Sequence, residues 1–462
     1  MDAARIALPF ALAAYFIYMG TRSRIYLLGI PFLMYMRASV FFQNAGVFWV
    51  PGRFDVNFLI FFWLVIVWLL CTDLLLPAVH GEARVRRFGG KLSLPEEGII
   101  LVLAAATVVQ LVLTIAQHGD PATAWSEALR FVYLLAGYFL VRAIVSTASL
   151  DEVLGFVRAL VIVSTGSAAL FVLHQAVHLD IYAGEEYLTT TFLGQTITRS
   201  FYFMPQLLLL SIAYIFSRRS WNVWTITALL VNLTAVWISY TRSLVVIAVV
   251  VIAISLLVRV FKGSQAGIAL RHAVTIGVVL GALAFGVTQF FPVQSQFFLG
   301  RISEATAASS VSEVGEVQVR ERKMLTTYRS IAQADATLGA GWVSAAQDPM
   351  ADRVERMQAD IVWVPILYRL GVVGVGIFVA AFALYAWRAA KLAASRSRDV
   401  ELFGIIWLCV IVGTFLEGFV SWTFMQPYRY AMGLWAFAFL GAVASMVRQS
   451  LDTLEPRESV KP

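Results

Sequence analysis

Five residues of this chain have side chains suited to chemistry on a phosphate-bearing substrate. Arg199 and Arg242 each stand close before an apolar run, while Arg322 and Arg329 lie seven residues apart in a polar stretch. A guanidinium donates two parallel hydrogen bonds, which match two oxygens of a diphosphate. Asp360, at the end of the same polar stretch, can orient a hydroxyl group or accept its proton if burial raises its pKa. Asp360 can equally cap the helix expected to begin after it.

Four further charged residues, Arg37, Arg130, Arg369 and Glu417, lie within apolar runs or at their edges. Ionisable groups in such positions are costly and tend to mark function. Any one arginine can be explained by a side chain that extends to the lipid headgroups. Arg369 and Glu417 are too deep for that explanation, so we expect the set to line a shared cavity near one face of the membrane, with Arg130 opening its segment.

The elements that carry these residues are predicted to be membrane-spanning helices. Of the 462 residues, 60% are hydrophobic and only 14% are charged, whereas soluble proteins carry about 25% charged residues. Apolar runs of about 18–22 residues recur along the chain, and each can cross a hydrocarbon core of about 30 Å. We expect an all-α polytopic membrane protein with about 12–13 transmembrane helices. The predicted segments are 4–19, 25–42, 57–70, 98–116, 131–145, 154–173, 202–216, 224–240, 244–260, 273–291, 361–387, 402–422 and 430–446.

Basic residues mark alternate connections between these segments. They are Arg22 and Arg24, Arg84 to Lys91, Arg218 and Arg219, Arg259 to Arg271, and Arg388 to Arg398. The positive-inside rule places these connections in the cytoplasm. We therefore divide the chain into helices 1–10 (1–291), a large extracytoplasmic loop domain (292–360), helices 11–13 (361–447) and a cytoplasmic tail (448–462). The four arginines suited to a diphosphate then share the outer face: Arg199, Arg242, Arg322 and Arg329.

Several classes of function are unsupported. The net charge of +7 comes from short loops, so topology explains it and nucleic acid is not an expected partner. Cys71 and Cys409 give no disulfide framework, and no cleavable signal peptide is evident. Residues 292–360 contain no histidine and no Asp-x-Asp pair, so we expect no metal and no other cofactor. Motifs for nucleotide-triphosphate, serine-hydrolase and zinc chemistry are missing from the sequence.

The polar stretch is expected to be partly helical, over 301–312 and 318–332. In the second helix an apolar stripe is formed by Val319, Leu325, Tyr328 and Ala332. Arg322 and Arg329 share another face, which fits either a diphosphate or solvent. Residues 339–342, Gly-Ala-Gly-Trp, indicate a tight turn in which backbone approaches another element closely. Elsewhere, Ser149 and Glu152 form a capping-box pattern.

Four stretches resemble the O-antigen ligase and polymerase superfamily of bacterial integral membrane proteins. They are residues 198–205, with Arg199 and Pro205; 240–243, with Arg242; Arg322 followed by Gly339 and Gly341; and 360–378, with Gly371 and Gly374. The resemblance implies a GT-C-like fold and metal-independent, inverting transfer from an undecaprenyl-diphosphate-linked glycan. The active site would face the periplasm from the bacterial inner membrane, and Arg199 and Arg242 would bind the diphosphate. Ligases usually carry histidine and asparagine where this chain has Asp360 and Ile361.

That departure favours a polymerase that joins lipid-linked repeat units to a glycan acceptor, as in exopolysaccharide or lipopolysaccharide biosynthesis. An O-antigen ligase acting on lipid A-core or another acceptor is the first alternative. A polysaccharide transporter or flippase is the second. A transporter predicts polar residues through the whole membrane depth, whereas we expect the inner half of the spans to be nearly free of charge.

Overall fold

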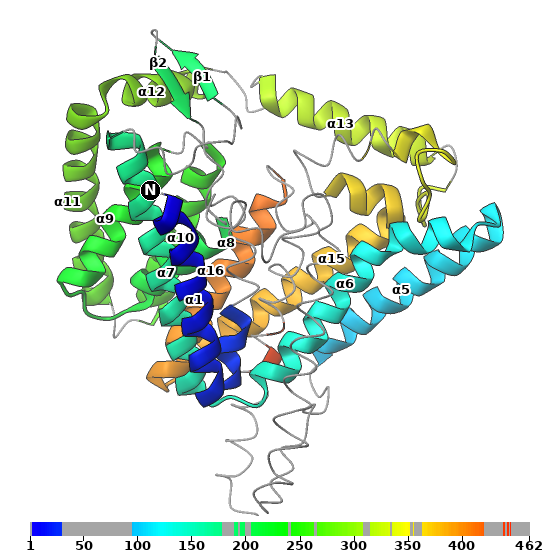
Figure 1. The fold of residues 1–462 in the computed structure, drawn as a ribbon, viewed down its shortest axis with the longest axis horizontal. Helices are drawn as coiled ribbons and strands as arrows, with labels where there is room; N and C mark the ends of the chain where they lie inside the picture. Colours follow the sequence, from blue (N-terminus) through cyan, green and yellow to red (C-terminus); the bar gives the residue numbers. More distant parts are fainter. Residues whose placement is uncertain are drawn as a thin grey trace, which may run out of the picture.

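The computed structural model describes residues 2–29, 95–177, 189–192, 195–198, 205–238, 242–262, 266–307, 315–332, 335–351, 354, 363–419 and four positions between 438 and 444. The elements, in chain order, are α1 (Asp2–Arg22), η1 (Arg24–Leu28), α5 (Pro95–His118), α6 (Pro121–Val145), α7 (Leu150–Val177), β1 (Thr189–Phe192), β2 (Gln195–Thr198), α8 (Pro205–Ser217), α9 (Val223–Ile238), α10 (Arg242–Phe261), α11 (Ala266–Phe290), α12 (Pro292–Ala307), α13 (Gly315–Ala332), α15 (Trp363–Ala393) and α16 (Arg398–Glu417) (Figure 1).

The protein is a helical membrane protein. Five described helices are long and apolar enough to cross a membrane: Glu97–His118, Leu150–Leu173, Ala266–Phe290, Trp363–Ala393 and Arg398–Glu417. The pair Pro121–Leu129 and Leu134–Val145, bent by 46°, can form a sixth span, and α8, α9 and α10 contain shorter apolar helices. Predicted segment 57–70 lies outside the described residues, as do most of 25–42 and 430–446. The total of 12–13 spans therefore stays a prediction.

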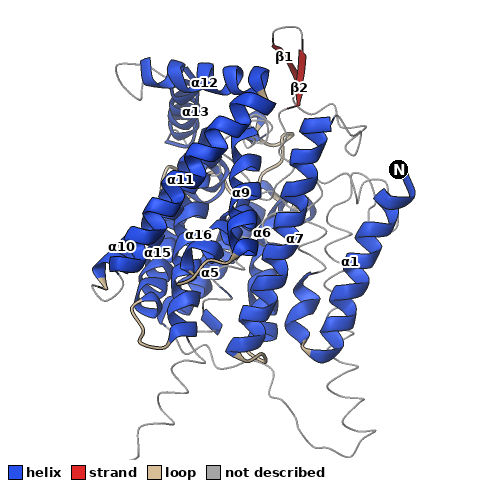
Figure 2. Cartoon of the chain, turned by 90° about the vertical axis from the view of Figure 1, so that its left-hand side faces the viewer, coloured by secondary structure: helices blue, strands red, loops and turns tan. Residues whose placement is uncertain are grey.

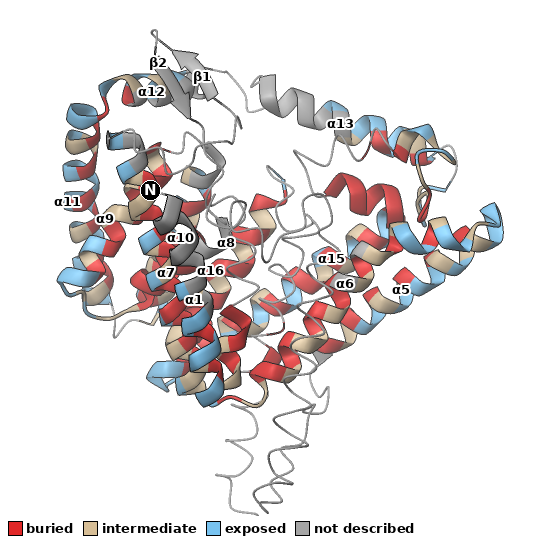
Figure 3. Cartoon of the chain, viewed as in Figure 1, coloured by how far each residue is buried: buried red, intermediate tan, exposed pale blue. Residues whose placement is uncertain are grey.

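Helix α16 lies at the centre of the bundle, where it packs against α8, α10 and α15. In the most apolar 18 residues of α16, 67% of the residues are buried. The corresponding share is 28% for α5 and for α11, which lie at the periphery. Helix α11 buries a single stripe, formed by Ala269, His272, Ile276, Val279, Leu283 and Val287. Its other faces are largely exposed (Figure 3). One buried stripe with apolar residues all round is typical of a helix that packs on protein on one side and contacts lipid on the other.

The bundle has two distinct ends. Helices α12 and α13 and the β1–β2 hairpin lie together at one of them, as both views show (Figures 1 and 2). The hairpin is antiparallel, with Thr189 opposite Thr198, and was not expected from the sequence. We call this the α13 end. The opposite end carries the α6–α7, α8–α9 and α15–α16 connections (Figures 1 and 2), and we call it the basic end.

Local capping fixes two of the helix starts. The Ser149 amide donates to Glu152 Oε2 (2.7 Å) and the Glu152 amide donates to Ser149 Oγ (3.3 Å), so the predicted capping box at the start of α7 is confirmed. Asp120 caps α6 by accepting a hydrogen bond from the Thr123 amide (3.1 Å), and Pro121 follows as the first helical residue. Both arrangements satisfy amide groups that a helix start leaves without an intrahelical partner.

Candidate functional site

Helix α10 brings Arg242 to the α13 end of the bundle. Just past its other terminus, Lys262 Nζ donates to the Ser395 carbonyl (2.9 Å) in the α15–α16 connection, which fixes that terminus at the basic end. Arg242 is the first residue of α10, and no acidic residue occurs in the first turn. A helix start of this kind presents free amide groups and the positive end of the helix dipole, which suits an anion.

Arg199 lies outside the described residues, but its chain neighbour Thr198 ends β2 at the same end of the bundle (Figure 2). Arg37 and Asp360 also lie outside the described residues. Their predicted roles stay predictions.

Arg369 is buried and makes its contacts with protein groups. Its Nη2 donates to Glu127 Oε2 on α6 (2.7 Å), and its Nη1 donates to the carbonyls of Val343 (2.6 Å) and Gly341 (3.3 Å). The guanidinium also lies 6.0 Å from the centre of the Trp342 ring. Its depth is therefore explained by an ion pair and two carbonyls, and we assign it the role of positioning the 341–343 backbone.

The Gly339–Trp342 segment is the predicted tight turn. Gly339 and Gly341 have φ of +77° and +78°, which glycine adopts without strain. A Cβ on Gly341 would lie 2.2 Å from Thr114 Oγ1 on α5. The Trp342 amide donates to that same Oγ1 (3.0 Å) and its indole Nε1 donates to the Thr107 carbonyl (3.3 Å). The close approach that the sequence indicated is thus to α5.

The same turn completes the hydrogen bonding of a break in α15. Gly371 has φ +63° and ψ −164° inside this helix. The Ala340 amide donates to the Tyr368 carbonyl (2.7 Å), and the amides of Val372 and Val373 donate to the carbonyls of Ala336 (3.0 Å) and Thr337 (3.2 Å). Backbone groups freed by the break thus find partners in residues 336–340, as buried groups in a membrane require.

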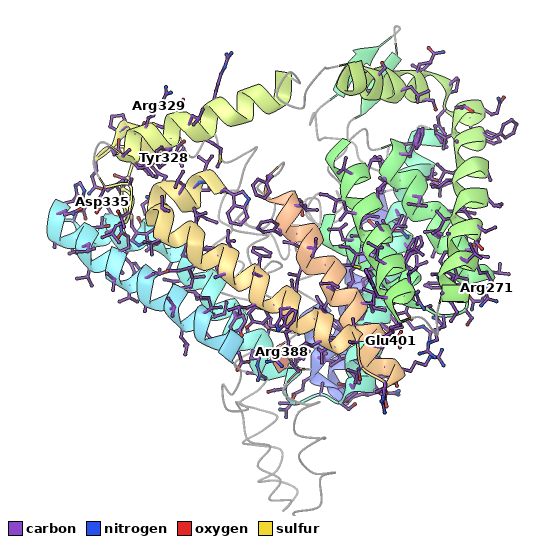
Figure 4. All side chains as sticks on the ribbon, turned by 180° about the vertical axis from the view of Figure 1, so that it is seen from behind. Arg271, Tyr328, Arg329, Asp335, Arg388 and Glu401 are labelled. Carbon is purple, nitrogen blue, oxygen red and sulfur yellow. The ribbon has the colours of Figure 1, made fainter. Side chains whose placement is uncertain are left out.

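Helix α13 exposes Arg322 and Arg329, as expected, but its predicted apolar stripe is wrong in part. Leu325 and Tyr328 are each 45% exposed, whereas Thr327 and Ile331 are buried at 0% and 2%. The helix packs on α15. Figure 4 shows Tyr328 and Arg329 at the α13 end, far from Arg388 and Glu401 at the basic end. Within the described residues, neither Arg322 nor Arg329 has an ion-pair partner, and the structure does not bring them together with Arg369.

The remaining predicted residues lie elsewhere in the spans. Arg130 is the tenth residue of α6 rather than a residue that opens its segment, because the helix begins earlier, at Pro121. Glu417 is the last residue of α16 and is 2% exposed. Neither is brought to Arg369 by a described contact.

Two ion pairs of α5, α6 and α15 were not predicted from the sequence. Glu127 is the partner of Arg369 although 242 residues separate them; an acidic residue near the start of an apolar run was the available signal. Glu97 and Arg142 form a second buried pair, with Nε to Oε1 at 2.5 Å and side chains 1% and 5% exposed. This pair joins α5 to α6, so these two apolar helices are not free of charge. The expectation of a nearly charge-free inner half stays a prediction, because it depends on the orientation of the chain in the membrane.

Within the part of the chain that the structure describes, no group of three or more His, Cys, Asp or Glu residues could hold a metal ion. Comparisons with protein-family models and with curated proteins each gave no match.

Proposed function

We propose that the protein is a membrane glycosyltransferase that joins undecaprenyl-diphosphate-linked glycan repeat units at the outer face of the bacterial cytoplasmic membrane. The observation that carries the proposal is the start of α10: Arg242 is its first residue, at the end of the bundle that also holds α12, α13 and the hairpin. An arginine and a helix dipole at one point provide two attractive interactions with a lipid diphosphate.

The chemistry assigns one role to each group. The acceptor hydroxyl oxygen attacks the anomeric carbon of the donor sugar, and the bond from that carbon to the diphosphate oxygen breaks. The electron pair leaves with the lipid diphosphate, whose growing negative charge Arg199 and Arg242 stabilise. The hydroxyl proton passes to the Asp360 carboxylate. Inversion at the anomeric carbon follows from attack opposite the leaving group, and the reaction needs no metal.

Exposed side chains of α13 fit an earlier step, the capture of the glycan-bearing lipid. Arg322 and Arg329 have no ion-pair partner in the described structure, and the exposed Tyr328 ring lies beside Arg329 in sequence. Guanidinium groups attract the anionic diphosphate over a distance of about a Debye length. The turn formed by Gly339–Trp342 lies at the same end of the bundle, where Thr114 holds it to α5 and Arg369 holds it to α15.

The test replaces Arg199, Arg242 and Asp360 singly by alanine in the full-length protein. Purified lipid-linked repeat units serve as donor and acceptor, and the length ladder of the products is read on a gel. We expect Arg242→Ala to slow elongation about 100-fold or more, as for other residues that stabilise transition-state charge. Arg271→Ala removes the same charge at the basic end and is the matched control, with wild-type elongation expected.

The products discriminate among the alternatives. A ladder of lengths supports a polymerase, whereas one finished chain attached to a different acceptor identifies a ligase. Movement of the lipid-linked glycan across a vesicle membrane without new glycosidic bonds identifies a transporter. Full elongation by a folded Arg242→Ala protein would overturn the proposed diphosphate role.

A further inference from the structure

A cavity at the basic end gathers four arginines that the proposed function does not use. Its volume is about 280 Å³, and its walls come from three helices and the α8–α9 connection. Helix α7 contributes Leu154, Gly155 and Arg158; α8 and the residues after it contribute Tyr214, Ser217, Arg218 and Arg219; and α16 contributes Arg398, Asp399, Glu401 and Leu402. Small-molecule sites occupy about 300–1,000 Å³, so this cavity suits a headgroup-sized ligand.

A buried carboxylate fixes the walls of this cavity. Glu401, in the first turn of α16, is 3% exposed and accepts a hydrogen bond from Arg219 Nη2 (2.9 Å). Its Oε2 also lies 3.2 Å from Lys262 Nζ. The carboxylate thus links the start of α16 to the α8–α9 connection and to the end of α10. Arg259 Nη2 donates to the carbonyls of Phe216 (3.2 Å) and Ser217 at the end of α8. Glu401 thus already pairs with Arg219 and Lys262. Among the described residues, the other three guanidinium groups of the cavity have no ion pair with it.

Three arginines of the cavity have no carboxylate partner in the described structure. Arg158 and Arg398 are exposed and have no described hydrogen bond from their side chains, while Arg218 Nη1 donates to the Tyr214 hydroxyl (3.2 Å). The remaining carboxylate of the lining, Asp399, offsets only one of these three positive charges. Arg398 also opens α16, whose N-cap residue Ser397 makes no side-chain hydrogen bond to the first turn. The cavity therefore has a net positive charge and free donors.

Membrane topology explains basic residues in loops but does not explain Arg158. This residue lies eight positions after Leu150, the first residue of α7, or about 12 Å along the helix axis. It therefore lies within a candidate span, where an arginine is costly. The cost of this arginine is offset if its guanidinium lines a polar cavity and binds an anion there.

We propose that this cavity binds the phosphate group of an anionic ligand, and that the ligand is a phospholipid headgroup at the cytoplasmic surface. The cavity opens where the spans α7 and α16 begin, and Leu154 and Leu402 provide apolar walls for the first acyl carbons. Trp387 on α15, 61% exposed and 5.1 Å from Lys391 Nζ, lies in the final turns of its span. Tryptophan and lysine at such a level are typical of the membrane interface.

The experiment measures binding of a fluorescent phosphatidylglycerol to the full-length protein in nonionic detergent, by anisotropy. We expect the double variant Arg158→Gln, Arg398→Gln to bind roughly tenfold more weakly for each guanidinium lost. Arg271→Gln is the matched control: it removes one charge at the same end, from α11, outside the cavity (Figure 4). Wild-type affinity is expected for it.

Competition identifies the source of the phosphate. Unlabelled phosphatidylglycerol should displace the probe at far lower concentration than phosphatidylcholine. Displacement of the probe by millimolar inorganic phosphate would show that the cavity binds phosphate from a soluble anion, and would overturn the assignment to a lipid headgroup. Equal displacement by phosphatidylcholine, or equal loss of affinity in Arg271→Gln, would overturn the proposal.

Folding of the variants is checked by thermal unfolding, with a wild-type melting temperature expected because Arg158 and Arg398 are exposed. The conservative double variant Arg158→Lys, Arg398→Lys keeps both charges but loses the planar fork, so intermediate affinity is expected. Wild-type affinity in a folded glutamine double variant would also overturn the proposal. The result is independent of glycosyl transfer, which concerns the opposite end of the molecule.

Discussion

The guanidinium of Arg369 holds together three pieces of chain that are far apart in sequence. It joins α15 to Glu127 on α6 and to the carbonyls of Gly341 and Val343. Charge-assisted bonds in a poorly hydrated interior are strong and directional. The residue therefore acts on any substrate only through the backbone that it positions, which distinguishes it from Arg242.

Replacing Arg369 by methionine should strongly destabilise the protein. Removal of one partner leaves the Glu127 carboxylate, which is 21% exposed, without its cation, and two carbonyls lose their donor. Losses of about 3 kcal/mol are typical when a buried pair is broken in this way. Thermal unfolding in detergent measures the effect, with Arg329→Met as an exposed, unpaired control. Equal melting temperatures for the two variants would contradict the assigned role.

At the scale of elements, the break in α15 restricts the sequence most, because it requires glycine at position 371. Gly371 adopts a backbone conformation found almost only in glycine, and a Cβ there would lie 2.2 Å from the Thr337 carbonyl oxygen. Residues 336–340 pack into the break and supply its missing hydrogen-bond partners. The geometry of the turn and that of the helix thus depend on each other.

Gly371→Ala should lower the melting temperature and the yield of folded protein, because it combines backbone strain with a steric clash. Gly376→Ala, five residues later in the same helix, is the matched control, since a Cβ there has no atom within 4 Å. The control should be neutral or slightly stabilising, because alanine favours helix over glycine by up to about 1 kcal/mol. Similar stability of the two variants, measured by thermal unfolding, would argue against a required break at Gly371.

The Asp120 cap of α6 predicts a pH dependence. Hydrogen bonds from Thr123 hold the pKa of Asp120 below its ordinary value of 3.8. Since the folded pKa is the lower one, the cap stabilises the protein above the unfolded pKa, and this stabilisation disappears as pH falls through the folded pKa. Asp120→Ala should therefore melt below wild type at neutral pH, and the difference should shrink below about pH 4. Asp120→Asn still caps but does not titrate, so its advantage over Asp120→Ala should persist in acid.

How much of the architecture could be predicted depends on the range of the interactions. The capping box at Ser149 and the end of α13 at Ala332 follow from neighbouring residues, and both were predicted, whereas α13 begins at Gly315, three residues before the expected start. The face that α13 turns to the bundle was not, because Thr327 and Ile331 are buried by contacts with distant helices while Leu325 and Tyr328 stay exposed. Likewise, nothing local to Arg369 identifies Glu127 among the carboxylates of the chain.

At the scale of the whole molecule, the two ends of the bundle differ in chemistry. The basic end has a cavity with four arginines framed around Glu401. The α13 end has a helix start at Arg242, a polar helix and a hairpin. A protein with one end in the cytoplasm and the other outside is expected to show such asymmetry.

The proposed orientation predicts opposite labelling of the two ends. In a background with Cys71→Ser and Cys409→Ser, Arg329→Cys should react with a membrane-impermeant maleimide in cells whose outer membrane is permeabilised. Arg396→Cys, exposed in the α15–α16 connection, should react only after the cytoplasmic membrane is opened. The cysteine-free background without either substitution gives the blank. Labelling of Arg396→Cys in cells with an intact cytoplasmic membrane would reverse the orientation.

The bonds at the break in α15 also close a loop in the chain. The amides of Val372 and Val373 donate to the carbonyls of Ala336 and Thr337. The two ends of the segment between Thr337 and Val372 therefore lie next to each other, as at the base of a hairpin. We therefore expect an epitope inserted within that loop to leave the register of α15 against residues 336–340 unchanged.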